Sequence, residues 1–98
     1  MKPLEDFADE RARVGEVAGK SCSPWLDPAR DFATEAQEES GDRHNYLTWE
    51  LHQARIAGEA SDEYVEAMMI AIQANRTSYV AALRAQQLRS QTREAKQK

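Results

Sequence analysis

The stretch that decides the fold is residues 62–92, which read DEYVEAMMIAIQANRTSYVAALRAQQLRSQT. Ser61 before it is a good N-cap, and acidic side chains in its first turn suit the positive end of a helix dipole. At 1.5 Å of rise per residue this helix would be about 45 Å long, which exceeds the width of a compact domain of 98 residues. The pattern therefore predicts a long C-terminal helix whose end projects or pairs with another element.

Two stripes run along this predicted helix at steps of three and four residues. One consists of very small side chains, at Ala67, Ala71, Ala74, Ser78, Ala81 and Ala85. The other consists of larger apolar side chains, at Val65, Met68, Met69, Ile72, Tyr79, Val80 and Leu83. A helix with such stripes on two sides is expected to pack against a neighbour on each. The alternative for the small stripe is surface filling, because alanine is a strong helix former.

Arg76 lies within the larger stripe, between Ile72 and Tyr79. Burying an unpaired guanidinium is costly, so its stem reaches the edge of the stripe, or it meets a carboxylate, or it belongs to a partner-binding face. Arg, Tyr, Met and Trp are enriched in protein interfaces. A tryptophan in the loop at 19–26 either fills the edge of a core or anchors an interface. The residues predicted to bind a partner are Trp25, Trp49, Met69, Arg76 and Tyr79.

Three shorter helices are predicted upstream of residue 62. The first covers 3–18, with Pro3 at its first position. The second covers 28–40, capped by Asp27, with Ala29, Phe32 and Ala36 facing inward and Gly41 as its end. The third covers 43–57, capped by Asp42 and closed by Gly58, and its apolar stripe is formed by Leu47, Leu51 and Ala54.

The composition predicts a thin core. Of the 41% of residues that count as hydrophobic, sixteen are alanines, and Leu, Ile, Val and Phe together number only fifteen. We therefore expect a single all-α domain over 1–98, built as a small bundle of three short helices and one long C-terminal helix. Its last part, 86–98, would be a frayed or projecting basic end. With so little large apolar content, we expect the fold either to be marginally stable alone or to gain stability from a partner or a second copy.

Charge is divided unevenly along the chain. Residues 1–63 hold 7 Lys and Arg against 15 Asp and Glu (−8), whereas residues 64–98 hold 6 against 2 (+4), and the sum is the net −4. The acidic face is predicted at Asp31, Glu35, Glu38, Glu39 and Asp42. It is either a solvated surface or a docking surface for a basic protein, such as one that handles nucleic acid.

The C-terminal cations have two interpretations. They compensate the dipole at a helix end, or they contact phosphates of nucleic acid. The residues concerned are Arg84, Arg89, Arg93, Lys96 and Lys98.

No catalytic, cofactor or metal site is predicted. His44 and His52 are eight residues apart, which is not the spacing of two ligands on one helix, and no Glu-x-x-His motif occurs. The single Cys22 fits a reducing compartment, and no apolar run reaches the length of a membrane span. These features favour a soluble cytoplasmic protein that is not an enzyme.

The leading functional hypothesis is a small protein-binding module. It would act as an adaptor or inhibitor of a larger protein or complex, for example nucleic-acid-handling machinery, in the manner of phage and mobile-element proteins. One alternative is a homodimeric helical protein that binds nucleic acid through its basic C-terminal helix. The other is a structural subunit of a larger assembly. Partner binding could also be combined with homodimer formation.

Overall fold

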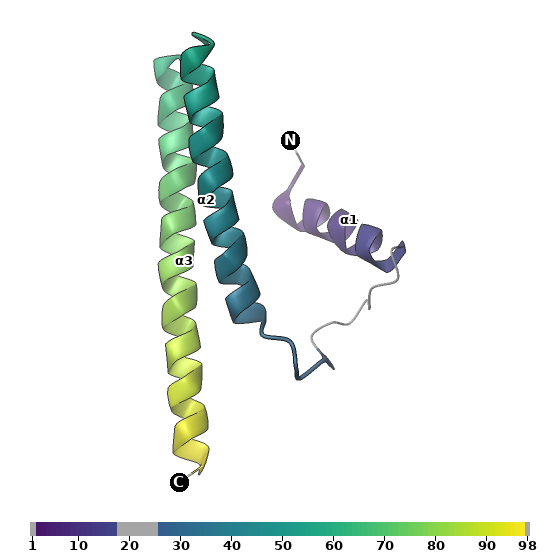
Figure 1. Ribbon diagram of the computed structural model, residues 1–98. Helices are drawn as coiled ribbons and strands as arrows, with labels where there is room; N and C mark the ends of the chain where they lie inside the picture. Colours follow the sequence, from purple (N-terminus) through teal and green to yellow (C-terminus); the bar gives the residue numbers. More distant parts are fainter. Residues whose placement is uncertain (1, 18–25, 98) are drawn as a thin grey trace. The chain divides into compact units, whose positions relative to one another are not determined.

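All the long regular elements of the described residues are α-helices. The computed structural model describes residues 2–17 and 26–97, and within these ranges it contains three helices and no strand (Figure 1). They are α1 (Leu4–Val17), α2 (Phe32–Ile56) and α3 (Asp62–Gln97). The predicted all-α class is confirmed, whereas the predicted bundle of four helices is wrong.

Two compact units make up the chain. The first is Met1–Asp31 and the second is Phe32–Lys98. We describe each by itself, and a single domain over 1–98 stays a prediction. In the first unit the carbonyl of Pro3 accepts a hydrogen bond from the Phe7 amide at 3.2 Å. Lys2 and Glu10 form an ion pair on the surface of the same unit.

Asp27 caps a turn and not a helix. Its carboxylate accepts a hydrogen bond from the Ala29 amide at 2.9 Å, and its carbonyl accepts one from the Arg30 amide at 3.3 Å. This local turn is a well-known use of Asp, which competes with its use as a helix cap. The prediction that a helix starts at Pro28 is therefore wrong, since α2 begins at Phe32.

Gly41 lies inside α2 and does not end it. The predicted helices 28–40 and 43–57 are one element, because Phe32–Ile56 is helical without interruption. Gly58 is the only described glycine with a positive φ, so Gly41 does not adopt the left-handed conformation of a helix C-cap. A glycine in a helix costs about 1 kcal/mol relative to alanine, and continuous packing along α3 outweighs that cost.

The predicted end of the third helix and start of the fourth are confirmed. Gly58 has a φ of 72°, its amide donates to the carbonyl of Arg55 at 3.1 Å, and the Glu59 amide donates to the carbonyl of Ala54 at 2.8 Å. This pair of hydrogen bonds is the Schellman motif. The Ser61 hydroxyl then accepts a hydrogen bond from the Tyr64 amide at 3.1 Å, so it is the N-cap of α3.

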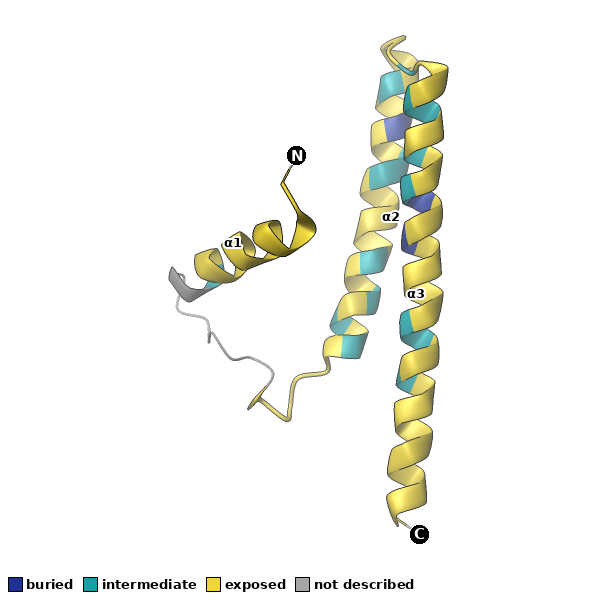
Figure 2. Ribbon diagram, turned by 180° about the vertical axis from the view of Figure 1, so that it is seen from behind, coloured by how far each residue is buried: buried dark blue, intermediate teal, exposed yellow. Residues whose placement is uncertain are grey.

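Helices α2 and α3 lie side by side and antiparallel, forming a helical hairpin (Figure 1). We call their contact the α2–α3 seam. Leu51 and Ile72 are its buried apolar residues, 7% and 8% exposed, and Asn75 is buried beside them. Figure 2 shows these buried positions between the turn and the middle of α3, and Asn75 is the one furthest from the turn. The half-buried residues of the seam include Ala33, Gln37, Ser40, Leu47, Ala54, Val65, Met68, Leu83 and Gln86.

The first part of α2 turns a different face inward from the one predicted. Ala36 and Phe32 are exposed, whereas Ala33 and Gln37 are half-buried. Because α2 is one helix, the face that carries Leu51 toward α3 also determines which residues face α3 about four to five turns earlier. A break at Gly41 would have freed the two segments to rotate independently.

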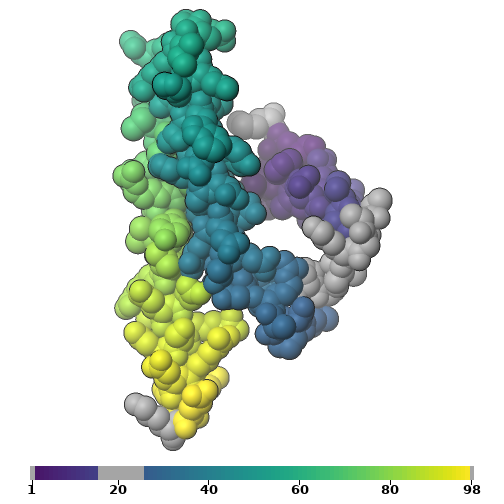
Figure 3. All heavy atoms as spheres, in the orientation of Figure 1, coloured from purple at the N-terminus to yellow at the C-terminus, as the bar shows by residue number. Residues whose placement is uncertain are grey.

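The C-terminal part of α3 continues beyond the start of α2. α3 has 36 residues and α2 has 25, and α3 stays helical to Gln97, further than the predicted end near Thr92. The space-filling view shows this end of α3 extending past the beginning of α2 (Figure 3). The basic residues near the C-terminus therefore lie on a part of α3 that α2 does not cover.

Candidate protein-binding surface

The side of α2 turned away from α3 carries a continuous row of acidic and aromatic residues. We call it the α2 outer face. Its members repeat at steps of three and four residues on the side opposite Leu51, so they share one side of the helix. They are Glu35, Glu38, Glu39, Asp42, Tyr46, Trp49 and Ile56.

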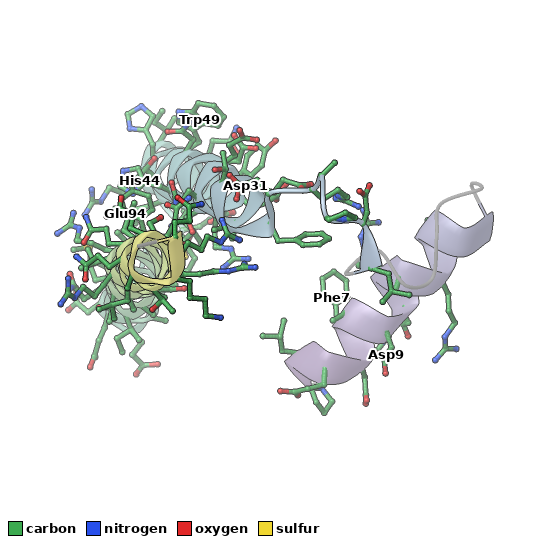
Figure 4. The ribbon with its side chains drawn as sticks, turned by 90° about the horizontal axis from the view of Figure 1, so that it is seen from below. Phe7, Asp9, Asp31, His44, Trp49 and Glu94 are labelled. Atoms are coloured by element: carbon green, nitrogen blue, oxygen red, sulfur yellow. The ribbon has the colours of Figure 1, made fainter. Side chains whose placement is uncertain are left out.

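The C-terminal half of this face is apolar and open to solvent. Tyr46, Trp49 and Ile56 are 66%, 59% and 76% exposed. The rings of Tyr46 and Trp49 pack edge to face, with centroids 5.9 Å apart and planes inclined by 73°, which is a favourable geometry for aromatic pairs. In the view along the hairpin, Trp49 lies on the side of α2 remote from α3 (Figure 4). The pair is therefore exposed on a side of α2 that α3 does not cover.

The N-terminal half of the face is acidic. Glu38, Glu39 and Asp42 are exposed and Glu35 is half-buried. Four of the five residues of the predicted acidic face thus lie on α2. Asp31 belongs to the first unit, directly before the helix.

The five predicted partner-binding residues do not form one cluster. Tyr79 and Arg76 line a groove of about 670 Å³ between α2 and α3, opposite Gln37, Gly41 and Asn45. Asp42 of the α2 outer face also borders this groove. Arg76 is exposed, so its guanidinium stays in water and pays no burial cost. Met69 and Trp49 lie outside the residues that line this groove, and Trp25 lies outside the described residues.

The small-residue stripe is not what α2 packs against. Five of its six residues are exposed, and Ala71 alone is half-buried. α2 instead covers the adjacent side of α3, which carries Val65, Met68, Ile72, Asn75 and Leu83. The use of the stripe for helix packing stays a prediction.

The predicted nucleic-acid contacts are exposed but not all on one side. Arg84, Arg89, Arg93 and Lys96 are exposed on α3, and Lys98 lies outside the described residues. Arg89, Arg93 and Lys96 follow each other at steps of four and three, so they share a side of the helix that Arg84 does not occupy.

Two sets of residues were missed by sequence reasoning. Tyr46 stands three residues before Trp49, and this spacing could have identified the aromatic pair. The polar seam was also missed: Asn75 Nδ2 donates to the carbonyl of Ser40 at 2.8 Å, and Gln37 donates to Gln86. Polar residues at seam positions give no signal until the partner helix is known.

Neither a membrane-spanning nor a metal-binding feature occurs in the described ranges. None of the described helices is long and apolar enough to cross a bilayer. Among residues 2–17 and 26–97, no three His, Cys, Asp or Glu side chains gather where they could hold a metal ion.

Comparison with known proteins adds no relative. No protein-family model, no curated protein and no solved structure matches the chain. The functional argument therefore depends on the chain's own surfaces.

Proposed function

We propose that the chain is a non-enzymatic protein-binding module that attaches to a larger protein through the α2 outer face, as an adaptor or inhibitor. The observation that carries the proposal is the edge-to-face pair of Tyr46 and Trp49, exposed at the end of an acidic row on the same side of one helix. Large aromatic residues at the centre of a contact supply most of the energy in many interfaces.

The chemistry of the face specifies the kind of partner. An apolar pocket would accept Trp49 and its neighbours, and a basic surface beside that pocket would face Glu38 and Asp42. Opposite charges increase the rate of encounter and select the orientation of docking. Proteins that bind nucleic acid carry such basic surfaces, which makes them the partner class that this face fits best.

The test is recovery of a partner from host lysate with the tagged full-length chain, with and without nuclease. Trp49→Ala is compared with His44→Ala, which removes an exposed ring from another side of the same helix, beside the groove. A single protein recovered in both nuclease arms, lost with Trp49→Ala and kept with His44→Ala, would support the proposal. Equal recovery with both variants would refute the assignment of the face. The stoichiometry of the recovered complex separates an adaptor from a structural subunit.

The acidic half has its own test. Reversing Glu38 and Asp42 to Lys should weaken binding about tenfold or more, because each new cation faces a basic surface. Reversing Glu59 in the turn and Glu66 on α3 to Lys changes the net charge equally, away from the row, and should leave binding nearly unchanged. Equal effects of the two double variants would mean that only net charge matters.

Nucleic-acid binding is the second candidate, favoured by one observation. The end of α3 that passes beyond α2 presents Arg89, Arg93 and Lys96 to solvent. Binding through these cations would fall steeply with salt, by about 0.9 log unit per tenfold salt for each phosphate neutralised. Affinity that does not change with salt would exclude this candidate.

A further inference from the structure

The side of α3 opposite the seam is a second unpartnered face, distinct from the α2 outer face. We call it the α3 outer face and define it by Ile70, Ala74, Thr77, Ala81 and Leu88, which repeat at helical spacing. Ile70 and Leu88 are 64% and 45% exposed. All five residues are exposed to solvent, and a shallow hollow opens beside Ile70, Ala74 and Thr77.

We propose that this face pairs with the same face of a second copy, with the two α3 helices antiparallel. Charge is the first argument for this occupant. Acidic residues occupy the beginning of α3, at Asp62, Glu63 and Glu66, and all of its described basic residues lie at or after Arg76. Antiparallel pairing brings the acidic beginning of each helix beside the basic end of the other, whereas parallel pairing would align like charges. The antiparallel arrangement also aligns the two helix dipoles favourably.

The order of apolar residues on the face is the second argument. With the two-fold axis near the level of Tyr79, Ile70 of each copy lies opposite Leu88 of the other, because both are nine residues from the axis. Thr77 and Ala81 then face each other across the axis. The large residues thus meet at the two ends of the contact, and small residues in its middle allow the helices to approach closely.

An isologous contact of this kind closes on itself, so it yields a dimer and no filament. The α2 helices lie on the remote sides of the paired α3 helices, which leaves both α2 outer faces free. The inference goes beyond the proposed function and does not depend on it. If both hold, the dimer presents two partner-binding faces, and binding to a repetitive partner gains from effective concentration.

The first experiment is sedimentation equilibrium of the full-length chain over its accessible concentration range. The monomer mass is 11.1 kDa, so a dimer has twice that mass. Ala81→Glu should weaken association about a hundredfold, because it places two carboxylates near the axis. Val80→Glu adds the same charge at the neighbouring exposed position, on another side of the helix, and should leave the dimer intact. Circular dichroism confirms that both variants keep their helices.

The second experiment tests orientation by disulfide cross-linking in a Cys22→Ser background. A mixture of Thr77→Cys and Ala81→Cys chains should cross-link between the two variants, whereas each variant alone should not. Parallel helices would give the reverse pattern. A monomer at every concentration, a dimer that Ala81→Glu leaves intact, or cross-linking of each variant with itself would overturn the proposal. None of these results bears on the partner-recovery experiment, so the two proposals fail separately.

Discussion

The two halves of the α2–α3 seam have the same backbone geometry, but among the described residues only one of them contains cross-helix hydrogen bonds between buried and half-buried polar residues. The half near the turn is apolar and contains Leu47, Leu51, Val65, Met68 and Ile72. The half toward the open end keeps the apolar Ala33 and Leu83 but also contains Gln37, Ser40, Asn75 and Gln86, which are joined across the helices by hydrogen bonds. Apolar burial stabilises without direction, whereas buried hydrogen bonds select one alignment at some cost in stability. We infer that the first half holds the hairpin together and the second specifies its register.

The largest effect on the free energy of unfolding is expected when a large side chain is removed from the apolar half of the seam. Leu51→Ala should lower the free energy of unfolding by about 2–4 kcal/mol, since it removes a buried side chain and leaves a cavity. Gln37→Ala in the half toward the open end should cost only about 1 kcal/mol. Urea unfolding followed by circular dichroism measures both, and equal losses would contradict the division of roles.

A smaller effect of opposite sign is expected at Asn75. This residue is 6% exposed, and its Oδ1 accepts no hydrogen bond from the described residues. Asn75→Leu should raise the free energy of unfolding by about 1–2 kcal/mol, because it replaces a poorly satisfied polar group by an apolar one of similar size.

Its control is Asn45→Leu, at an exposed position of α2. That change should stay within about 0.5 kcal/mol. A loss of stability in Asn75→Leu would show that the hydrogen bond to the Ser40 carbonyl contributes more than the unpaired oxygen costs.

Gly41 does not interrupt α2, although its sequence context predicts a helix end there. Gly41→Ala should stabilise the chain by about 1 kcal/mol, because a Cβ at this position meets nothing within 4 Å and alanine is the better helix former. Gly58→Ala should destabilise it by about 1 kcal/mol, since φ there is +72°. Thermal unfolding distinguishes the two, and a loss of stability at both positions would contradict an uninterrupted α2.

The smallest effect on stability is expected at Trp49, which belongs to neither half of the seam. Trp49→Ala should lower the free energy of unfolding by less than about 1 kcal/mol, because the residue is 59% exposed and loses chiefly its edge-to-face contact with Tyr46. The same variant should lose the partner. Unfolding and binding measured on one preparation check this, and a large loss of stability would identify Trp49 as a structural residue.

Capping residues predicted the end of a helix correctly where the conformation or hydrogen bond of a single residue determines that end. Gly58 closes α2 and Ser61 caps α3 as expected, because each position is governed by the backbone conformation or hydrogen bond of that residue. Gly41 and Asp27 misled for the same reason. Each residue is compatible with a helix boundary, and packing along α3 or a competing turn decided otherwise.

The candidate surface was predictable only in parts. Exposure of Trp49 and the acidic residues follows from their spacing on one helix, and the stripe of Leu47, Leu51 and Ala54 toward α3 was recognisable for the same reason. That the acidic and aromatic residues form one row required α2 to continue through Gly41. The separation of Trp49 from Arg76 and Tyr79 required the α2–α3 pairing.

The sequence by itself determined the helical class, the turn between α2 and α3 and the long C-terminal helix, because propensity, caps and periodicity act within a few residues. Only the tertiary structure decided which sides of the two helices meet, that a glycine stays helical, and which faces remain open. These outcomes depend on contacts between residues distant in the chain, such as Asn75 with Ser40 and Gln37 with Gln86. These contacts stabilise the fold only when both helices are formed and in register.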